Sequence, residues 1–219
     1  MHVVANAAAS VDGKLSTRRR EQVAISGPAD FERVDRLRAE VDAVMVGVGT
    51  VLADDPSLTV DDPDLVAGRE AQGEPAQPAR VVADSRARTP TDAGVLDDAA
   101  ATYLLVSSSA PVERVDALEA AGATVLAAGA ERVDLPEALA ALESAGVERL
   151  LVEGGGELLF SMFADDLIDE LSVYVGSFVI GGRDAPTLVD GEGFVEEFPN
   201  LTLESVERLD DGVLLSYRT

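Results

Sequence analysis

Residues 149–163 have the sequence RLLVEGGGELLFSMF, and this stretch decides the fold. The opening RLLV is a short apolar run of the kind that forms a buried strand, and a helix is expected from residue 155 onward. Three consecutive glycines lie between them, where the absence of a side chain lets a ligand approach the backbone closely. A strand that leads directly into a helix is the unit from which parallel α/β sheets are built.

The same alternation of apolar runs and helical segments continues along the chain in both directions. Strands are predicted at residues 2–9, 41–47, 80–83, 102–107, 124–127, 149–152 and 170–175, and helices at residues 28–40, 112–121 and 135–145. Residues 202–208 and 213–218 flank a turn at 210–212 and predict an antiparallel hairpin. Residues 61–79 are rich in Pro, Gly, Asp and Gln and are predicted to form a surface loop. The pattern predicts one domain over residues 1–219, with a largely parallel sheet covered on both faces.

Composition excludes several kinds of site. The 219 residues contain no cysteine, which rules out disulfides, cysteine zinc sites and a thiol nucleophile. The only histidine is His2, so neither a catalytic triad nor a histidine metal site can be assembled. Hydrophobic residues make up 47% and aromatic residues 4%, so the core is expected to be aliphatic.

The chain is strongly acidic, with a formal net charge of −24. Such a surface repels nucleic acid and anionic lipid, and Lys14 is the only lysine. The acidic residues are spread along the chain, as in proteins of salt-accumulating halophiles, and an ordinary acidic cytosolic protein is the alternative. No apolar run reaches the length of a transmembrane helix, and no signal peptide is evident, so a cytoplasmic location is expected.

The three glycines at residues 154–156, called the glycine turn below, and the glutamate before them form the clearest candidate site. The first N–H groups of a helix are unpaired and, with the helix dipole, favour a phosphate; a plain strand-to-helix turn is the alternative. Glu153 ends a strand that is expected to be central, at the edge where open α/β sheets bind ligands. Its carboxylate can accept hydrogen bonds from a substrate; the alternative is that it only interacts favourably with the dipole of the following helix.

Two further strand ends carry polar side chains. Thr50 and Asp54 can contact a ribose or a phosphate, although Asp-Asp-Pro is also common turn chemistry. Ser85, Arg86 and Arg88 suit the ribose 2′-phosphate of NADPH, and surface pairing with nearby aspartates is the alternative. A basic island at residues 18–20 either receives an anionic substrate or is a solvated loop.

Four motifs occur in order along the chain: SVDGK at 10–14, VDAVMVGVGTVLADDP at 41–56, LVEGGG at 151–156 and GGRDAPT at 181–187. Together they resemble the riboflavin-biosynthesis reductase family, in its stand-alone archaeal and fungal form. The resemblance implies a dihydrofolate-reductase-like three-layer α/β fold, with a mostly parallel central sheet and a C-terminal antiparallel hairpin. It also implies NADPH as cofactor, a homodimer, and reduction of a phosphorylated ribosylaminopyrimidine to its ribitylamino product.

The resemblance assigns roles by position. The cofactor contacts, with Arg86 added from its place at the strand end, are Thr50, Asp54, Val82, Ala83, Asp84, Ser85, Arg86, Gly154, Gly155, Gly156 and Glu157. The substrate contacts it implies are Ser10, Gln22, Arg38, Leu58 and Glu153. The family often has Thr where this chain has Glu157. Glu153, Lys14 and Asp12 are the candidate catalytic residues, and the proton donor is a water, Asp12 or Lys14.

Three alternatives remain open. The chain lacks the ligands of the zinc deaminase that bacterial members carry, so the diamino compound is the expected substrate, with the deaminated uracil as an alternative. Dihydrofolate reductase is the nearest rival, and Glu32 or Asp35 would then hold a pteridine. A nucleotide-binding module without turnover is a rival from another class.

Overall fold

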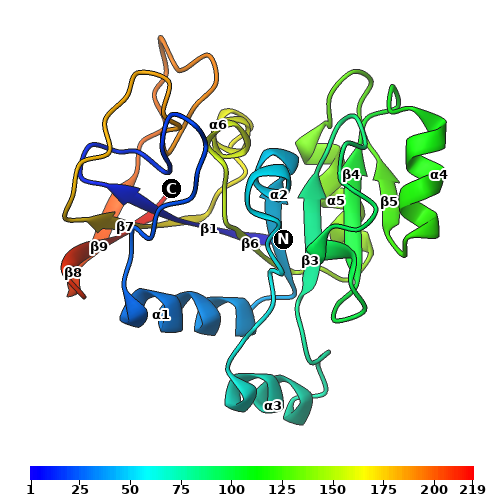
Figure 1. Ribbon diagram of the computed structural model, residues 1–219, viewed down its shortest axis with the longest axis horizontal. Helices are drawn as coiled ribbons and strands as arrows, with labels where there is room; N and C mark the ends of the chain where they lie inside the picture. Colours follow the sequence, from blue (N-terminus) through cyan, green and yellow to red (C-terminus); the bar gives the residue numbers. More distant parts are fainter. The chain divides into compact units, whose positions relative to one another are not determined.

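The computed structural model describes all 219 residues, which divide into two compact units (Figure 1). Unit 1 comprises Met1 and Asp35–Leu151, and unit 2 comprises His2–Val34 and Val152–Thr219. The chain passes from one unit to the other within helix α1 (Pro28–Ala39) and within strand β6 (Arg149–Val152). The single domain expected from the sequence stays a prediction.

Unit 1 is built on parallel strands. These strands are β2 (Ala43–Gly47), β3 (Ala79–Ala83), β4 (Thr102–Val106) and β5 (Thr124–Ala127). They lie in the order β5-β4-β3-β2, and β6 lies next to β2. The central strands are continuous apolar runs because both of their faces are buried. Helix α2 (Val48–Asp54) packs on β2 and β3, while α4 (Val112–Ala120) and α5 (Leu135–Ser144) pack on β5.

Unit 2 combines one parallel pair with an antiparallel hairpin. Strand β1 (His2–Ser10) runs parallel to β7 (Glu170–Gly176), which pairs antiparallel with β9 (Gly212–Arg218), and β9 pairs antiparallel with β8 (Thr202–Leu209). Helix α6 (Gly156–Ala164) follows the glycine turn. The predicted parallel strands and C-terminal hairpin are therefore confirmed.

One prediction about the loops is wrong. Residues 61–79 are not a continuous surface loop, because they contain helix α3 (Pro63–Ala71). The Asp62 carboxylate caps this helix by accepting a hydrogen bond from the Asp64 N–H at 2.8 Å, and Pro63 occupies the first turn. An Asp-Pro start is a recognised helix signal, and it outweighed the loop-like composition that follows it.

A second difference lies after β2, where residues 48–54 form helix α2 and place Thr50 and Asp54 on one short helix. A three-residue 3₁₀ helix, η1 (Gly94–Leu96), follows β3. None of the helices combines the length and the apolar character needed to cross a membrane.

Candidate active site

The glycine turn leaves the start of α6 without a side-chain cap. Gly154 has φ +102°, in the region that favours glycine, and a Cβ at this position would meet no atom within 4 Å. Gly155 is the N-cap residue and makes no side-chain cap hydrogen bond, whereas Asp62 and Asp134 cap α3 and α5. Gly155 thus supplies no side-chain acceptor to the first N–H groups of α6, and Gly154, although buried, has free space on the side where a Cβ would lie.

Gly156 has a different role, because a loop packs directly on it. A Cβ at Gly156 would overlap the carbonyl oxygen of Thr187 and lie 3.1 Å from the Asp190 Cγ. The Asp190 N–H donates to the Gly156 carbonyl at 3.1 Å. Glu157, in the first turn of the helix, is exposed, and Glu153 is half-buried. The three glycines therefore divide their tasks between a turn and a close packing contact.

The predicted residues of the N-terminal loop lie together in unit 2. The Ser10 hydroxyl donates to the Asp12 carboxylate at 2.7 Å, and the Lys14 Nζ donates to the Ala185 carbonyl at 3.0 Å. The Ser10 hydroxyl, followed by the Ile180 N–H, lowers the pKa of Asp12 below its ordinary value of 3.8. Asp12 is therefore an anion at neutral pH and carries no proton to donate.

The candidate residues of α2 and the following segment lie in unit 1. Thr50 is half-buried, and partial burial of the carboxyl raises the pKa of Asp54 although the residue as a whole is exposed. Leu58 is buried with φ 56°, and the Arg38 Nη1 donates to the Thr59 carbonyl at 2.8 Å. The segment that bears Leu58 is thus held to α1.

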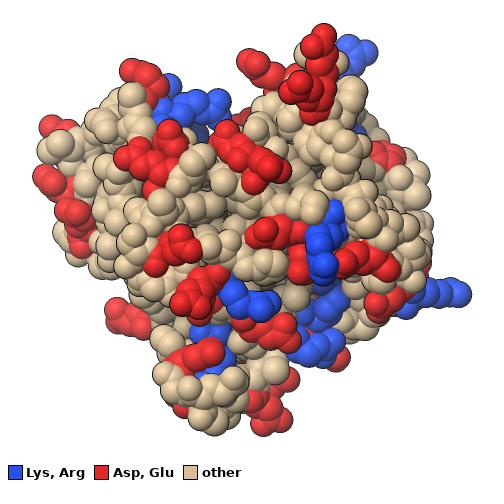
Figure 2. All heavy atoms as spheres, turned by 180° about the vertical axis from the view of Figure 1, so that it is seen from behind, with Lys and Arg blue, Asp and Glu red and all other residues tan.

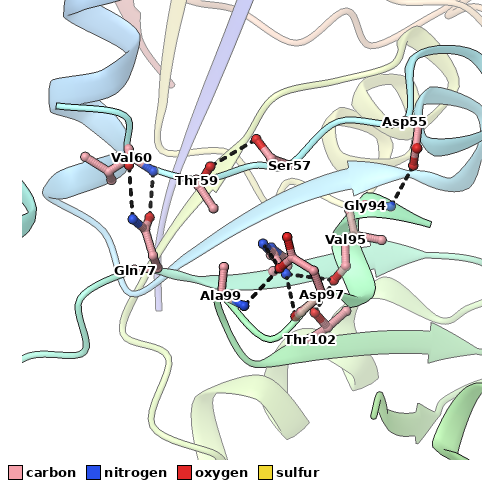
Figure 3. A network of polar contacts seen from close by, with 11 residues as sticks. Asp55, Ser57, Thr59, Val60, Gln77, Gly94, Val95, Asp97, Ala99 and Thr102 are labelled. Carbon is pink, nitrogen blue, oxygen red and sulfur yellow. Dashed lines mark hydrogen bonds and ion pairs between the residues drawn. The ribbon is translucent and has the colours of Figure 1, made fainter. Parts of the chain in front are cut away.

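Figure 3 shows further contacts that fix this segment and its neighbours. Gln77 exchanges two hydrogen bonds with the Val60 backbone, and the Asp55 carboxylate accepts from the Gly94 N–H at 2.7 Å. The fully buried Arg80 pairs with Asp97 at 2.7 Å. The sequence analysis missed these contacts, because an arginine that opens an apolar strand gives no sign of where its side chain ends.

At the end of β3 the polar side chains separate into two groups. Asp84 is fully buried, and its Oδ2 accepts from the N–H and hydroxyl of Thr89 at 2.7 and 2.8 Å. Ser85 Oγ accepts from the Val133 N–H at 3.0 Å. Arg86 and Arg88 are exposed and form no ion pair. The alternative of surface pairing with nearby aspartates is therefore wrong. Two cations remain open to an anionic ligand.

Each unit brings one set of predicted residues together. Unit 2 contains Ser10, Asp12, Lys14, Gln22, Glu153, Gly154, Gly155, Gly156 and Glu157, and unit 1 contains Arg38, Thr50, Asp54, Leu58, Val82, Ala83, Asp84, Ser85 and Arg86. Gln22 is exposed and Val82 is buried in the sheet, so only the backbone of Val82 is open to a ligand role.

Each unit contains parallel strands that are followed by polar or glycine residues, which makes this chain an α/β protein; open sheets of this class bind ligands at the carboxyl ends of their strands. It belongs to the RibD C-terminal domain family, whose model matches residues 1–215.

Two archaeal relatives match almost the whole chain. The 2,5-diamino-6-ribosylamino-4(3H)-pyrimidinone 5′-phosphate reductase of Archaeoglobus fulgidus is 46% identical over 217 residues, which cover 99% of this chain and 97% of that protein. The protein of the same name from Methanothermobacter thermautotrophicus is 48% identical over 203 residues, covering 93% and 90%.

Among solved structures, Acinetobacter baumannii RibD matches with a TM-score of 0.77 and 26% identity over 99% of this chain and 57% of that one. A pyrimidine reductase-like protein from Corynebacterium diphtheriae matches with a TM-score of 0.80 at 17% identity, covering 99% and 91%, which shows the fold alone. The predicted family and the dihydrofolate-reductase-like α/β fold are confirmed.

Proposed function

We propose that this chain is an NADPH-dependent reductase of riboflavin biosynthesis, acting on 2,5-diamino-6-ribosylamino-4(3H)-pyrimidinone 5′-phosphate. The observation that carries the proposal is the 46% identity to a reductase of that name over nearly the full length of both chains. The product is the ribitylamino compound. The diamino substrate is favoured over the deaminated uracil because both archaeal relatives bear its name.

The residues present fit a dinucleotide. The open space beside Gly154 and the uncapped start of α6 suit a phosphate group, and Arg86 and Arg88 suit the 2′-phosphate that distinguishes NADPH from NADH. We retain Thr50, Asp54 and the end of β3 as further proposed contacts. When bound, this cofactor supplies the hydride, while the protein orients the reactants and excludes water.

Ring opening breaks the bond between C1′ and the ring oxygen, and the amine nitrogen stays bonded to C1′; the reduction therefore also needs a proton on that nitrogen. Hydride addition at C1′ of the ring-opened imine gives a secondary amine once the nitrogen has gained that proton. Asp12 is an anion, so Lys14 and water remain as donors. Lys14 Nζ has three N–H bonds, one of which is used by Ala185, and we propose it as the donor.

Glu153 is proposed to orient the substrate through its carboxylate. Because Glu153→Gln keeps the shape and removes the charge, turnover should fall about tenfold or more, roughly 1.4 kcal/mol, while NADPH affinity changes little. Glu113→Gln is the matched control, since it removes an exposed carboxylate from the first turn of α4, which carries none of the proposed contacts. If Glu153 only made a favourable electrostatic interaction with the helix dipole, both variants would lose roughly 0.3–1 kcal/mol of stability and keep the kcat/KM of the wild type.

The assay follows NADPH oxidation with the diaminopyrimidine phosphate, its deaminated analogue and dihydrofolate. The dihydrofolate reductase alternative is disfavoured, because the Asp35 carboxylate accepts from the Asp61 and Asp62 N–H groups, both at 2.8 Å, and Glu32 is exposed. Turnover of dihydrofolate alone would overturn the proposed substrate. NADPH binding without turnover of any of the three would favour the non-catalytic alternative.

We also propose a homodimer in a salt-rich cytoplasm. Edge strand β8 exposes Leu203 at 51% and Val206 at 60%, which leaves apolar surface for a second copy to cover. Figure 2 shows acidic side chains scattered over the visible face, with fewer basic ones, several of which lie beside acidic side chains. High salt screens the repulsion that this charge creates within and between chains.

A further inference from the structure

Three segments of unit 2 that are far apart in sequence are tied into one assembly. They are the turn at residues 10–15, the loop at residues 180–190, and Gly156 at the start of α6. We name residues 180–190 the strap. Its contacts begin at Asp12 and end at the first residue of α6.

The turn that carries Asp12 is rigid. The Gly13 N–H donates to the Ser10 carbonyl at 2.8 Å, with Gly13 at φ +77°, and the Ser10 N–H donates to the Lys14 carbonyl at 2.9 Å. The Ser10 hydroxyl joins both ends, because it accepts from the Lys14 N–H at 3.0 Å and donates to Asp12 at 2.7 Å. Hydrogen bonds within the turn therefore orient the Asp12 carboxylate independently of its contacts with the strap.

Asp12 binds the strap through both carboxylate oxygens. Oδ1 accepts from the Ile180 N–H at 3.0 Å, and Oδ2 accepts from the Gly181 N–H at 2.8 Å. Charged acceptors on backbone N–H groups make stronger hydrogen bonds than neutral ones. The carboxylate thus accepts from two consecutive backbone N–H groups of the strap, and this arrangement fixes a loop.

The turn continues to hold the strap beyond Asp12. Lys14 Nζ donates to the Ala185 carbonyl at 3.0 Å, and the Leu15 N–H donates to the Pro186 carbonyl at 2.9 Å. Lys14 and Thr187 form an antiparallel bridge. Ala185 is only 4% exposed, so the strap is packed against the protein at this residue, whereas residues 182–184 are exposed.

The far end of the strap lies on the start of α6. The Asp190 N–H donates to the Gly156 carbonyl at 3.1 Å, and the Asp190 Oδ1 accepts from the Thr187 N–H at 3.1 Å. The Thr187 carbonyl occupies the space that a side chain at Gly156 would need. A shift of the strap would therefore change the surroundings of the first turn of α6.

We propose that Asp12 is a positioning residue, which holds the strap against Gly156 and so sets the shape of the cofactor-binding turn. The role rests on the proposed function, in which this turn binds NADPH. In this role Asp12 needs no contact with the cofactor or the reacting atoms. It acts through the strap on cofactor affinity, so its loss should appear in KM for NADPH and not in kcat.

The test is Asp12→Asn in the full chain. An amide offers one acceptor where the carboxylate has two, so amide hydrogen exchange at Ile180 and Gly181 should accelerate. KM for NADPH should rise about tenfold while kcat at saturation stays within about twofold. Asp211→Asn is the control, because Asp211 also accepts two side-chain hydrogen bonds in unit 2, from Tyr174 and Ser177, without contacting the strap. This control should leave KM unchanged.

A second variant acts at the other end of the strap. Asp190→Asn removes the carboxylate that accepts from Thr187 and should also raise KM for NADPH. Because both changes loosen the same strap, the double variant should be less impaired than the product of the two single effects. Independent, multiplicative effects on KM would overturn the proposal.

The remaining outcomes separate the positioning role from the proposed function. Accelerated exchange in Asp12→Asn with an unchanged KM would overturn the positioning role while leaving the reductase intact. A fall in kcat with unchanged KM would also overturn it, by placing Asp12 in the chemistry. If the wild-type protein did not bind NADPH, the proposed function would fail and the positioning role with it.

Discussion

Gly156→Ala tests whether the third glycine is required by packing. The added Cβ would overlap the Thr187 carbonyl oxygen and lie 3.1 Å from both the Asp190 N and Cγ. Backbone cannot move away as easily as the end of a flexible side chain, so the strap must shift. Overpacking of this kind costs about 1–3 kcal/mol, and loss of the hydrogen bond from Asp190 to Gly156 adds about 0.5–1.5 kcal/mol.

A gain in helix propensity offsets part of this cost. Replacing glycine by alanine inside a helix contributes about 0.5–1 kcal/mol of stability, and less at a helix start. The net loss for Gly156→Ala is therefore about 1–4 kcal/mol. For a chain of this length, each kcal/mol corresponds to roughly 2–4 °C in melting temperature. We expect a fall of about 2–16 °C, together with weaker NADPH binding.

Gly68→Ala is the matched control. Gly68 lies in α3, has no atom within 4 Å of its Cβ position, and does not have positive φ. The same chemical change should raise the melting temperature there by a few degrees, through the propensity gain of about 0.5–1 kcal/mol alone. Thermal unfolding and NADPH titration of both variants complete the experiment. A melting temperature for Gly156→Ala equal to or above that of the wild type would refute the packing argument.

Two further predictions concern the cofactor and the solvent. In the double variant Arg86→Ala/Arg88→Ala, the ratio of kcat/KM for NADPH to kcat/KM for NADH should fall by roughly 10- to 100-fold, about 1.5–3 kcal/mol. The control Arg208→Ala, on β8, should leave this ratio unchanged. Equal use of both cofactors by the wild-type protein would contradict the prediction. In molar KCl the melting temperature should rise and sedimentation should give a two-chain particle, because the charge of −24 is then screened; a flat or falling melting temperature would contradict the halophile interpretation.

Strands and candidate strand ends could be predicted from the sequence because their signals are local. The run AVMVG is apolar without interruption, and TYLLV is apolar after Thr102, as is typical of strands buried on both faces. Asp62-Pro63, the capped start of α3, is also a local signal in the sequence, whereas the composition of residues 61–79 favours a loop. The loop prediction was therefore wrong although a positive signal for a helix was available.

Contacts made by polar side chains across long sequence separations could not be predicted. The Asp12 carboxylate accepts from the Gly181 N–H across a separation of 169 residues, and these two residues follow the paired strands β1 and β7. Arg80 reaches Asp97 across a loop whose path the sequence does not reveal. The motif that contains Asp12 indicates a functional residue, but its local sequence is equally compatible with a proton donor and with a residue that holds a loop in place. Only the three donors around the carboxylate, which lower its pKa, distinguish the two.

The arginines after β3 show why exposure without an ion pair is not enough to indicate a site. Exposed ion pairs contribute little, so an unpaired surface arginine is ordinary by itself. Here the loop is fixed by other residues: Asp84 holds Thr89, and Arg114 donates to the carbonyls of Ala87 and Thr89 at 2.9 and 2.6 Å. Ala87, at φ 52°, is fully buried, while its neighbours Arg86 and Arg88 are exposed. Because this loop is already ordered, an anion that binds these two arginines does not have to order their backbone.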